Sequence, residues 1–153
     1  MEPPRRVSLP HVPPAFVPSG SLFFITVCTT PRGENQLAYP AVWAELRTAT
    51  EHYHIAGRWH VPLLLAMPDH LHLLAGFAAT ESMPRVVAAW KHFLSQRCRV
   101  TWQRDFFDHR LRIGESHEEK ARYIRNNPVR AGLVATPEAW PYVWTPESVA
   151  PLR

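Results

Sequence analysis

Two short apolar runs separated by Pro68 and Asp69 constrain the fold of this chain most. The runs read VPLLLAM and HLHLLAGF and lie between Trp59 and Phe77. Proline followed by aspartate is turn chemistry, so the pattern predicts an antiparallel hairpin of two strands over residues 59–77. Pro62 lacks the backbone N–H that a ladder needs, so we expect the first strand to begin near it or to contain a bulge there.

Strands and helices alternate on both sides of this hairpin. The run SLFFITVCTT at residues 21–30 is β-branched and aromatic and predicts a buried strand, and residues 106–111 form a short strand candidate. Apolar residues at three- and four-residue steps predict helices over 40–54, 82–99 and 116–126. The order βαββαβα is typical of an α+β fold: a ferredoxin/RRM-like antiparallel sheet with helices packed on one face.

The ends of the last two predicted helices are marked by particular residues. Ser82 and Ser116 are expected N-caps, and Glu119 would close a capping box with Ser116. Pro128 disfavours helical geometry at Asn127, so the third helix is expected to end there. The aromatic segment that follows, with Trp140, Tyr142 and Trp144, is expected to pack back onto the domain.

The length of 153 residues and the 46% hydrophobic content fit a single domain. Six of the sixteen prolines fall in the first eighteen residues, so we expect an extended proline-rich arm over 1–20, one domain over 21–145 and a tail over 146–153. No apolar run approaches the ~18 residues of a membrane span, which predicts a soluble, cytoplasmic protein. Cys28 and Cys98 lack CxxC spacing and are interpreted as core residues.

His70 and His72 are the first candidates for chemistry. They stand two apart in a predicted strand, so both imidazoles project from one face of the sheet and could share a metal ion, while Leu71 and Leu73 point to the other face. The pattern alone is weak, and two polar histidines at the rim of the sheet would look the same. A third ligand would have to come from another element.

The helix predicted over 116–126 offers a second pair of candidates. Tyr123 and Asn127 are four residues apart, which places a phenol and a carboxamide on one helix face. Such a pair could supply a nucleophile and a metal ligand together, although a tyrosine in an amphipathic helix more often only packs in a core.

The basic residues suggest a polyanionic partner. The chain has 17 Lys and Arg against 13 Asp and Glu, and all of the 17 except Lys91 and Lys120 are arginine. Arginine suits phosphate clamping, and many arginines lie between residues 97 and 130, interleaved with Trp102, Phe106 and Phe107. Guanidinium groups with aromatic rings are suited to single-stranded nucleic acid, although these rings could equally be core residues.

Four ordered motifs, rather than any single residue, make the chain recognisable: MPDHLHLL, WQRDFFDHRLR, YIRNNPVRAGLV and WPY. Together they resemble the REP-associated tyrosine transposases, a branch of the single-tyrosine HUH transposases. The resemblance covers residues 23–142 and implies a ferredoxin/RRM-like fold with the HUH pair on a central strand and the tyrosine on a following helix.

The resemblance implies a role for each matching residue. His70, His72 and Asn127 would bind Mg²⁺ or Mn²⁺, and Tyr123 would attack single-stranded DNA at REP-like hairpins to give a 5′-phosphotyrosine intermediate. The enzyme would be associated with the nucleoid and would act as a monomer, with a homodimer as the alternative. For DNA contacts we expect Arg110, Arg112 and Arg130 on phosphates, together with Trp102, because these residues lie in or beside the motifs.

Two other functions remain compatible with the residues. One is a non-catalytic, RRM-like protein that binds single-stranded nucleic acid, such as a degenerate transposase. The other is a metal-dependent phosphohydrolase that uses the histidine pair and a water nucleophile, in which case Tyr123 would be dispensable. Substitution of Tyr123 by phenylalanine separates these functions from the transposase.

Overall fold

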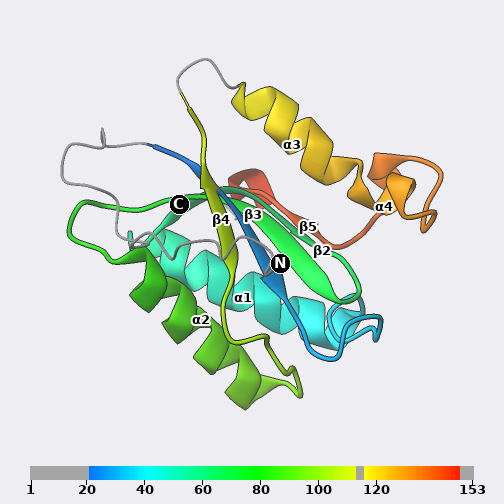
Figure 1. Cartoon of the computed structure of the whole chain (residues 1–153), viewed down its shortest axis with the longest axis horizontal. Coiled ribbons are helices and arrows are strands. Elements are labelled where there is room, and N and C mark those ends of the chain that lie inside the picture. The colour runs from blue at the N-terminus through cyan, green and yellow to red at the C-terminus, as the bar shows by residue number, and fades with distance from the viewer. Residues whose placement is uncertain (1–20, 113–115, 149–153) are drawn as a thin grey trace, which may run out of the picture.

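The computed structural model describes residues 21–112 and 116–148. Within these residues, five strands form one antiparallel sheet in the order β4-β1-β3-β2-β5 (Figure 1). Their bounds are β1 Phe23–Cys28, β2 His60–Ala66, β3 His70–Gly76, β4 Phe107–Arg110 and β5 Val143–Trp144. The predicted hairpin is thus confirmed as β2 and β3, and the histidine pair lies on the middle strand of the sheet. The predicted arm over 1–20 and the last five residues of the predicted tail lie outside the described residues.

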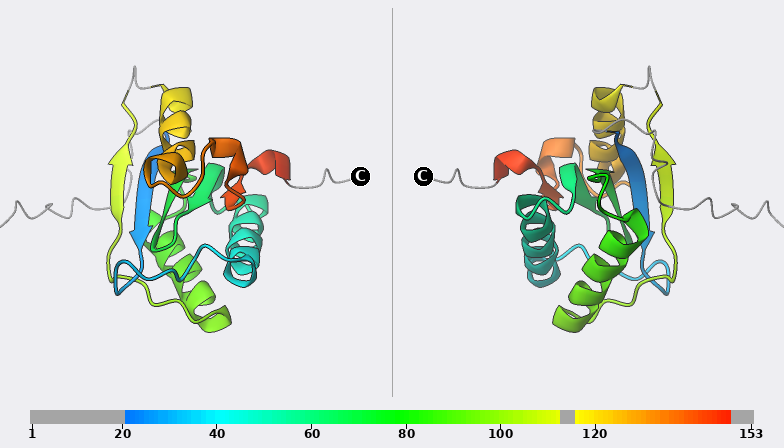
Figure 2. Two further views of the ribbon diagram at one scale, coloured as in Figure 1. Left: turned by 90° about the vertical axis from the view of Figure 1, so that its right-hand side faces the viewer. Right: turned by 90° about the vertical axis from the view of Figure 1, so that its left-hand side faces the viewer.

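The helices do not all lie on one face of the sheet. The structure contains α1 (Pro40–Ile55), α2 (Met83–Arg97), α3 (His117–Arg125) and α4 (Asn127–Arg130), with short 3-10 turns at Pro137–Ala139 and Pro146–Ser148. Figure 1 shows α1 and α2 together on one side of the sheet and α3 on the other, and both views in Figure 2 keep α3 and α4 apart from them. The α+β class is confirmed, and the placement of all helices on one face is corrected.

Two hydrophobic clusters explain this arrangement, one on each face of the sheet. The larger cluster joins β1, β2 and β3 to α1 and α2 through residues such as Ile25, Leu73 and Trp90. The smaller cluster joins the other face to Ile124 of α3. Apolar residues on both faces of β2 and β3 therefore need a cover on each side, and α3 provides the second one.

Pro62 coincides with an irregularity in β2, as expected. The pairing of β2 with β3 shifts its register between His60 and Leu63. As a result Val61 and Leu64, which are three residues apart, both belong to the cluster under α1 and α2, while Leu63 and Leu65 face α3. A bulge that adds one residue to a strand produces this change of facing.

The N-cap predictions are confirmed in position and differ in detail. Ser116 accepts a hydrogen bond at Oγ from the backbone N–H of Glu119 over 3.2 Å, whereas the side chain of Ser82 makes no capping bond. The third helix ends at Arg125, one residue before the predicted end at 126, but the expectation that Pro128 keeps Asn127 out of helical geometry is wrong. The helical path breaks after Arg125, and α4 begins at Asn127 with Pro128 in its first turn, where a missing N–H costs nothing.

The aromatic C-terminal segment packs back onto the sheet, as predicted. Trp144 is fully buried in the larger cluster, β5 pairs with β2, and Trp140 Nε1 donates to the Ala66 carbonyl over 2.9 Å. Cys28 is buried and Cys98 is half-buried against the larger cluster, and neither forms a disulfide. Among the described residues, no helix combines the length and the apolar character needed to cross a membrane.

Candidate active site

His70 and His72 project from β3 on the face turned away from α1 and α2. Their ring centroids lie 4.8 Å apart, and the intervening Leu71, with Leu73, is buried in the larger cluster on the opposite face. The two-residue period of the strand therefore separates the polar pair from the core, as the sequence predicts.

Both imidazoles use their Nδ1 atoms to contact a neighbouring side chain. His70 Nδ1 lies 2.7 Å from Asp69 Oδ1, and His72 Nδ1 lies 3.0 Å from Thr26 Oγ1 on β1. A carboxylate only accepts hydrogen bonds, so His70 carries its proton on Nδ1 and keeps a lone pair on Nε2. A partner at Nδ1 that orients the ring and leaves Nε2 for a metal ion is typical of ligating histidines.

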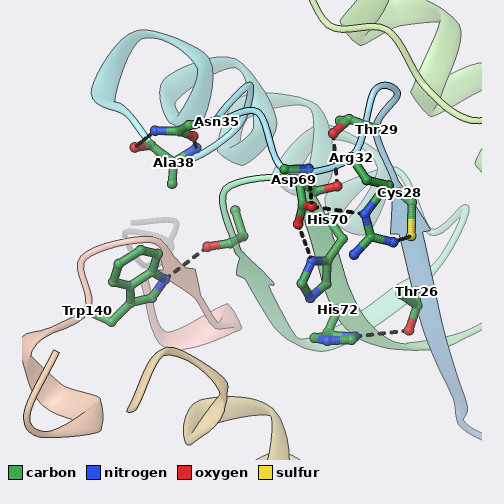
Figure 3. A network of polar contacts seen from close by, with 12 residues as sticks. Thr26, Cys28, Thr29, Arg32, Asn35, Ala38, Asp69, His70, His72 and Trp140 are labelled. Carbon is green, nitrogen blue, oxygen red and sulfur yellow. Dashed lines mark hydrogen bonds and ion pairs between the residues drawn. The ribbon is translucent and has the colours of Figure 1, made fainter. Parts of the chain in front are cut away.

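Asp69 is itself held in place by the turn that follows β1. Its Oδ2 accepts from Arg32 Nε over 2.9 Å and from the Gly33 backbone N–H over 2.8 Å (Figure 3). Burial of Asp69 opposes its ionisation, but the hydrogen bonds from His70, Gly33 and Arg32 outweigh burial and hold the pKa of the carboxyl well below its ordinary value. The group that orients His70 is therefore a fixed, charged carboxylate.

His72 is held in its neutral form. Burial lowers the pKa of His72 to about 3, and repulsion from the neighbouring His70 ring when that ring is protonated, and from the Arg130 and Arg32 guanidinium groups, lowers it further. A neutral imidazole is the form that binds a metal ion.

Tyr123 lies on α3 above the same face of the sheet. Its side chain is 52% exposed, so it is not a core phenol. Its ring centroid lies 6.3 Å from that of Phe24, which in turn lies 5.3 Å from the ring of His72. One aromatic ring thus links the tyrosine to the histidine pair, although 51 residues separate Tyr123 from His72 in the sequence.

Asn127 is the first residue of α4 and shares this region with Tyr123. Its Oδ1 accepts a hydrogen bond from Arg130 Nη2 over 2.9 Å, and its Nδ2 is buried with no partner among the described residues. An amide oxygen has two lone pairs, so the bond from Arg130 leaves one acceptor position on Oδ1.

These donors fit a small divalent ion of the Mg²⁺ or Mn²⁺ kind. Within residues 21–112 and 116–148, no group of three His, Cys, Asp or Glu side chains could hold a metal. Two oriented imidazoles and one amide oxygen would form a mixed nitrogen and oxygen set, which Mn²⁺ accepts more readily than Mg²⁺, since Mg²⁺ prefers oxygen alone. A metal ion held by the two histidines would therefore need a third ligand such as Asn127, a role that the proposed function takes up.

The four residues predicted to contact DNA are scattered. Arg130 lies beside Tyr123, with its guanidinium carbon 4.1 Å from the centre of the phenol ring. Arg110 ends β4 opposite Phe23, which belongs to the cluster on the far face, and Arg112 follows β4 and is exposed. Trp102 packs against Trp90 and donates from Nε1 to the Lys91 carbonyl, so the structure does not bring Trp102 to the histidine face.

Phe107, unlike Trp102, lies on the same face of the sheet as the histidine pair. Strand pairing places Phe107 opposite Thr26, and Thr26 opposite His72, in one row across β4, β1 and β3. Directly paired residues of antiparallel strands point to the same face, and Phe107 is 48% exposed. An accessible aromatic ring therefore lies in the same row as His72.

Sequence reasoning missed the residues that orient the histidines. Asp69 precedes the pair directly and was assigned only to a turn, although a carboxylate beside a histidine motif is itself a signal. Thr26 and Phe24 are ordinary strand residues in the sequence. Their roles follow from the register of β1 against β3. The spacing of residues along the chain does not reveal that register.

The fold and the site together define an α+β domain of ferredoxin/RRM-like strand order, with an HxH pair on the central strand and an exposed tyrosine on a following helix. No family model matches the chain. A Haemophilus influenzae protein that bears the provisional name REP-associated tyrosine transposase is 26% identical over 144 residues, which cover 80% of this chain and 78% of that protein.

Two solved structures have a fold similar to that of this chain. A REP-associated tyrosine transposase bound to a REP hairpin matches with a TM-score of 0.69 and 21% identity, over 84% of this chain and 78% of that one. A provisionally named transposase from Deinococcus radiodurans matches with a TM-score of 0.50 and 16% identity, over 73% and 89%. The resemblance found in the sequence is confirmed: this chain is a homologue of the REP-associated tyrosine transposases.

Proposed function

We propose that this protein is a metal-dependent, single-stranded DNA endonuclease and strand transferase that acts on REP-like hairpins. The observation that carries the proposal is the meeting of two elements on one face of the sheet. His70 and His72 are oriented there by partners at Nδ1, and the half-exposed Tyr123 lies one aromatic ring away. The solved relative bound to a REP hairpin supports the choice of DNA substrate.

The proposed reaction is an exchange of phosphodiester bonds. The Tyr123 oxygen forms a bond to the scissile phosphorus, and the bond from phosphorus to the 3′ oxygen of the upstream nucleotide breaks. The phenol gives up its proton and the departing 3′ oxygen takes one up, so the products are a 5′-phosphotyrosine adduct and a 3′-hydroxyl. The adduct keeps the energy of the bond, and attack by a 3′-hydroxyl on it transfers the strand.

His70, His72 and Asn127 would hold the Mg²⁺ or Mn²⁺ ion in this proposal. The ion would act as a Lewis acid on the non-bridging oxygens of the scissile phosphate. Asp69 and Thr26 keep the two imidazoles in the orientation that ligation needs. The half-exposed position of Tyr123 leaves its ring accessible to a strand that enters from solvent.

Charge around the tyrosine supports a DNA substrate. Arg130 places a guanidinium beside Tyr123, and we propose it as a phosphate contact, with the exposed Arg112 after β4 as a further contact. Arg110 pairs with Phe23 on the far face, so it could contact only DNA that passes around the edge strand β4. The simplest assembly is a monomer that acts on its own tyrosine, because Tyr123 and the histidine pair meet within one chain. An enzyme with this substrate would work on the bacterial nucleoid.

The test uses labelled hairpin oligonucleotides copied from palindromes that flank the gene. Incubation with the protein and Mn²⁺ is expected to give a protein–DNA adduct that survives SDS. The variant Tyr123→Phe should fold normally and form none. Tight hairpin binding without an adduct would favour the non-catalytic protein, and cleavage that persists in Tyr123→Phe would favour the phosphohydrolase with a water nucleophile.

A further inference from the structure

Arg130 makes three contacts with the two residues proposed for catalysis on α3 and α4. Its Nη2 donates to the Tyr123 backbone carbonyl over 2.7 Å and to Asn127 Oδ1 over 2.9 Å. Its guanidinium carbon lies 4.1 Å from the centre of the Tyr123 ring. We infer that Arg130 is a positioning residue that holds the Tyr123 nucleophile and the Asn127 ligand in one fixed arrangement, an inference that rests on the proposed function.

The break between α3 and α4 explains why such a residue is needed. In an unbroken helix Tyr123, Asn127 and Arg130 would share one face because of their spacing. Here α3 ends at Arg125 and α4 begins at Asn127, so Tyr123 and Asn127 belong to different helices. Tyr123 is among the last residues of α3, whose carbonyls lack helical partners, and Arg130 supplies a donor to one of them. One guanidinium therefore spans the break.

The contact with Asn127 also determines which amide atom can act as a ligand. A guanidinium has only donors, so the atom of Asn127 that faces Arg130 is the oxygen. The oxygen that would bind the metal is thereby fixed in orientation and keeps a lone pair for the ion. Without Arg130, rotation of the amide could bring Nδ2, which has no lone pair to offer, to the metal.

The contact with Tyr123 constrains the phenol ring. A planar guanidinium over an aromatic face is held by a cation–π interaction. The ring is half exposed, so few other groups limit its rotation. Since an error of about 1 Å in the placement of a reacting group can cost on the order of 100-fold in rate, a restraint on this ring is a restraint on catalysis.

The variant Arg130→Lys tests this role because it keeps the positive charge and removes the planar fork. We expect the rate of adduct formation at saturating hairpin DNA to fall on the order of 10- to 100-fold, with little change in the Kd for DNA. We also expect weaker Mn²⁺ binding by calorimetry in the absence of DNA, because Asn127 Oδ1 is no longer held. Arg122→Lys, an exposed arginine on α3, is the matched control and should change neither quantity.

Other roles for Arg130 give different results, each of which overturns the inference. If Arg130 only contacts phosphate, Arg130→Lys would raise the Kd for DNA and leave the saturated rate and the Mn²⁺ affinity unchanged. If Arg130 only caps α3, Arg130→Lys would lower the unfolding midpoint and leave the rate of adduct formation per folded molecule unchanged. Failure of the wild-type protein to form an adduct would overturn the proposed function instead, and the Mn²⁺ titration would still show whether Arg130 orients Asn127.

Discussion

The two faces of the sheet differ in cover and in chemistry. One face lies under α1 and α2, and residues such as Ile25, Leu71 and Leu73 are buried there in a continuous apolar cluster. The other face is covered in part by α3, and its middle strand carries His70 and His72. Neighbouring residues on β3 therefore alternate between the apolar core and the candidate site. A single strand thus supplies the core with one set of side chains and the candidate site with the other.

The partial cover on the histidine face is what brings the site together. Ile124 anchors α3 through the smaller cluster, and its neighbour Tyr123 remains half exposed. A face buried as completely as the opposite one would leave the histidines inaccessible to any substrate. A face with no cover would have no helix to carry the tyrosine.

The largest effect should come from the face under α1 and α2. Leu73→Ala removes a buried side chain and leaves a cavity, so the free energy of unfolding should fall by about 2–5 kcal/mol in denaturant titrations. The rate of adduct formation per folded molecule should stay close to that of the wild type. A loss of less than about 1 kcal/mol would show that this face is not the main source of stability.

Asp69→Asn should weaken the site on the other face with a smaller change in stability. Removal of the charge that orients His70 should lower Mn²⁺ affinity about 10- to 100-fold by calorimetry. Glu34→Gln, an exposed acid that follows Gly33 in the same turn, is the control and should leave the affinity unchanged. Equal affinities for Asp69→Asn and the wild type would remove Asp69 from the metal site.

Phe107 and Trp102 are aromatic residues on different faces of the sheet, and substitution of each by alanine should affect DNA affinity differently. Loss of a stacking ring in the row of His72 should cost about 1–3 kcal/mol of affinity for single-stranded DNA in fluorescence titrations. Trp102→Ala should instead lower the unfolding midpoint, because Trp102 packs on Trp90, and it should keep DNA affinity. The reverse result would restore Trp102 as the DNA contact expected from the sequence.

The smallest effect should come from the cap of α3. Ser116→Ala removes the hydrogen bond to the Glu119 N–H and should lower the free energy of unfolding by about 1 kcal/mol. Ser82→Ala is a matched control, because Ser82 occupies the same position on α2 without a capping bond, and its effect should stay within about 0.5 kcal/mol. Equal losses in the two variants would mean that the Ser116 bond does not stabilise α3.

The sequence predicted the elements well because their signals are local. The run of apolar residues on each side of Pro68 and Asp69 defined β2 and β3, and helical spacing defined α1 and α2. The prediction for Pro128 failed because a proline that ends one helix can also begin the next. Trp102 was chosen as a DNA contact because it lies among arginines in the sequence, a pattern that a core residue shares.

The sequence by itself determined which side chains share a face of one element. The two-residue period of a strand placed His70 and His72 together and away from Leu71 and Leu73. Only the tertiary structure decided what meets this pair: Thr26 through the register of β1, Asp69 through its bonds to the turn after β1, and Tyr123 through the packing of α3 on the second face. The physical reason is that the period of an element follows from its own backbone geometry, whereas contacts between elements depend on strand register and on which apolar face each helix covers.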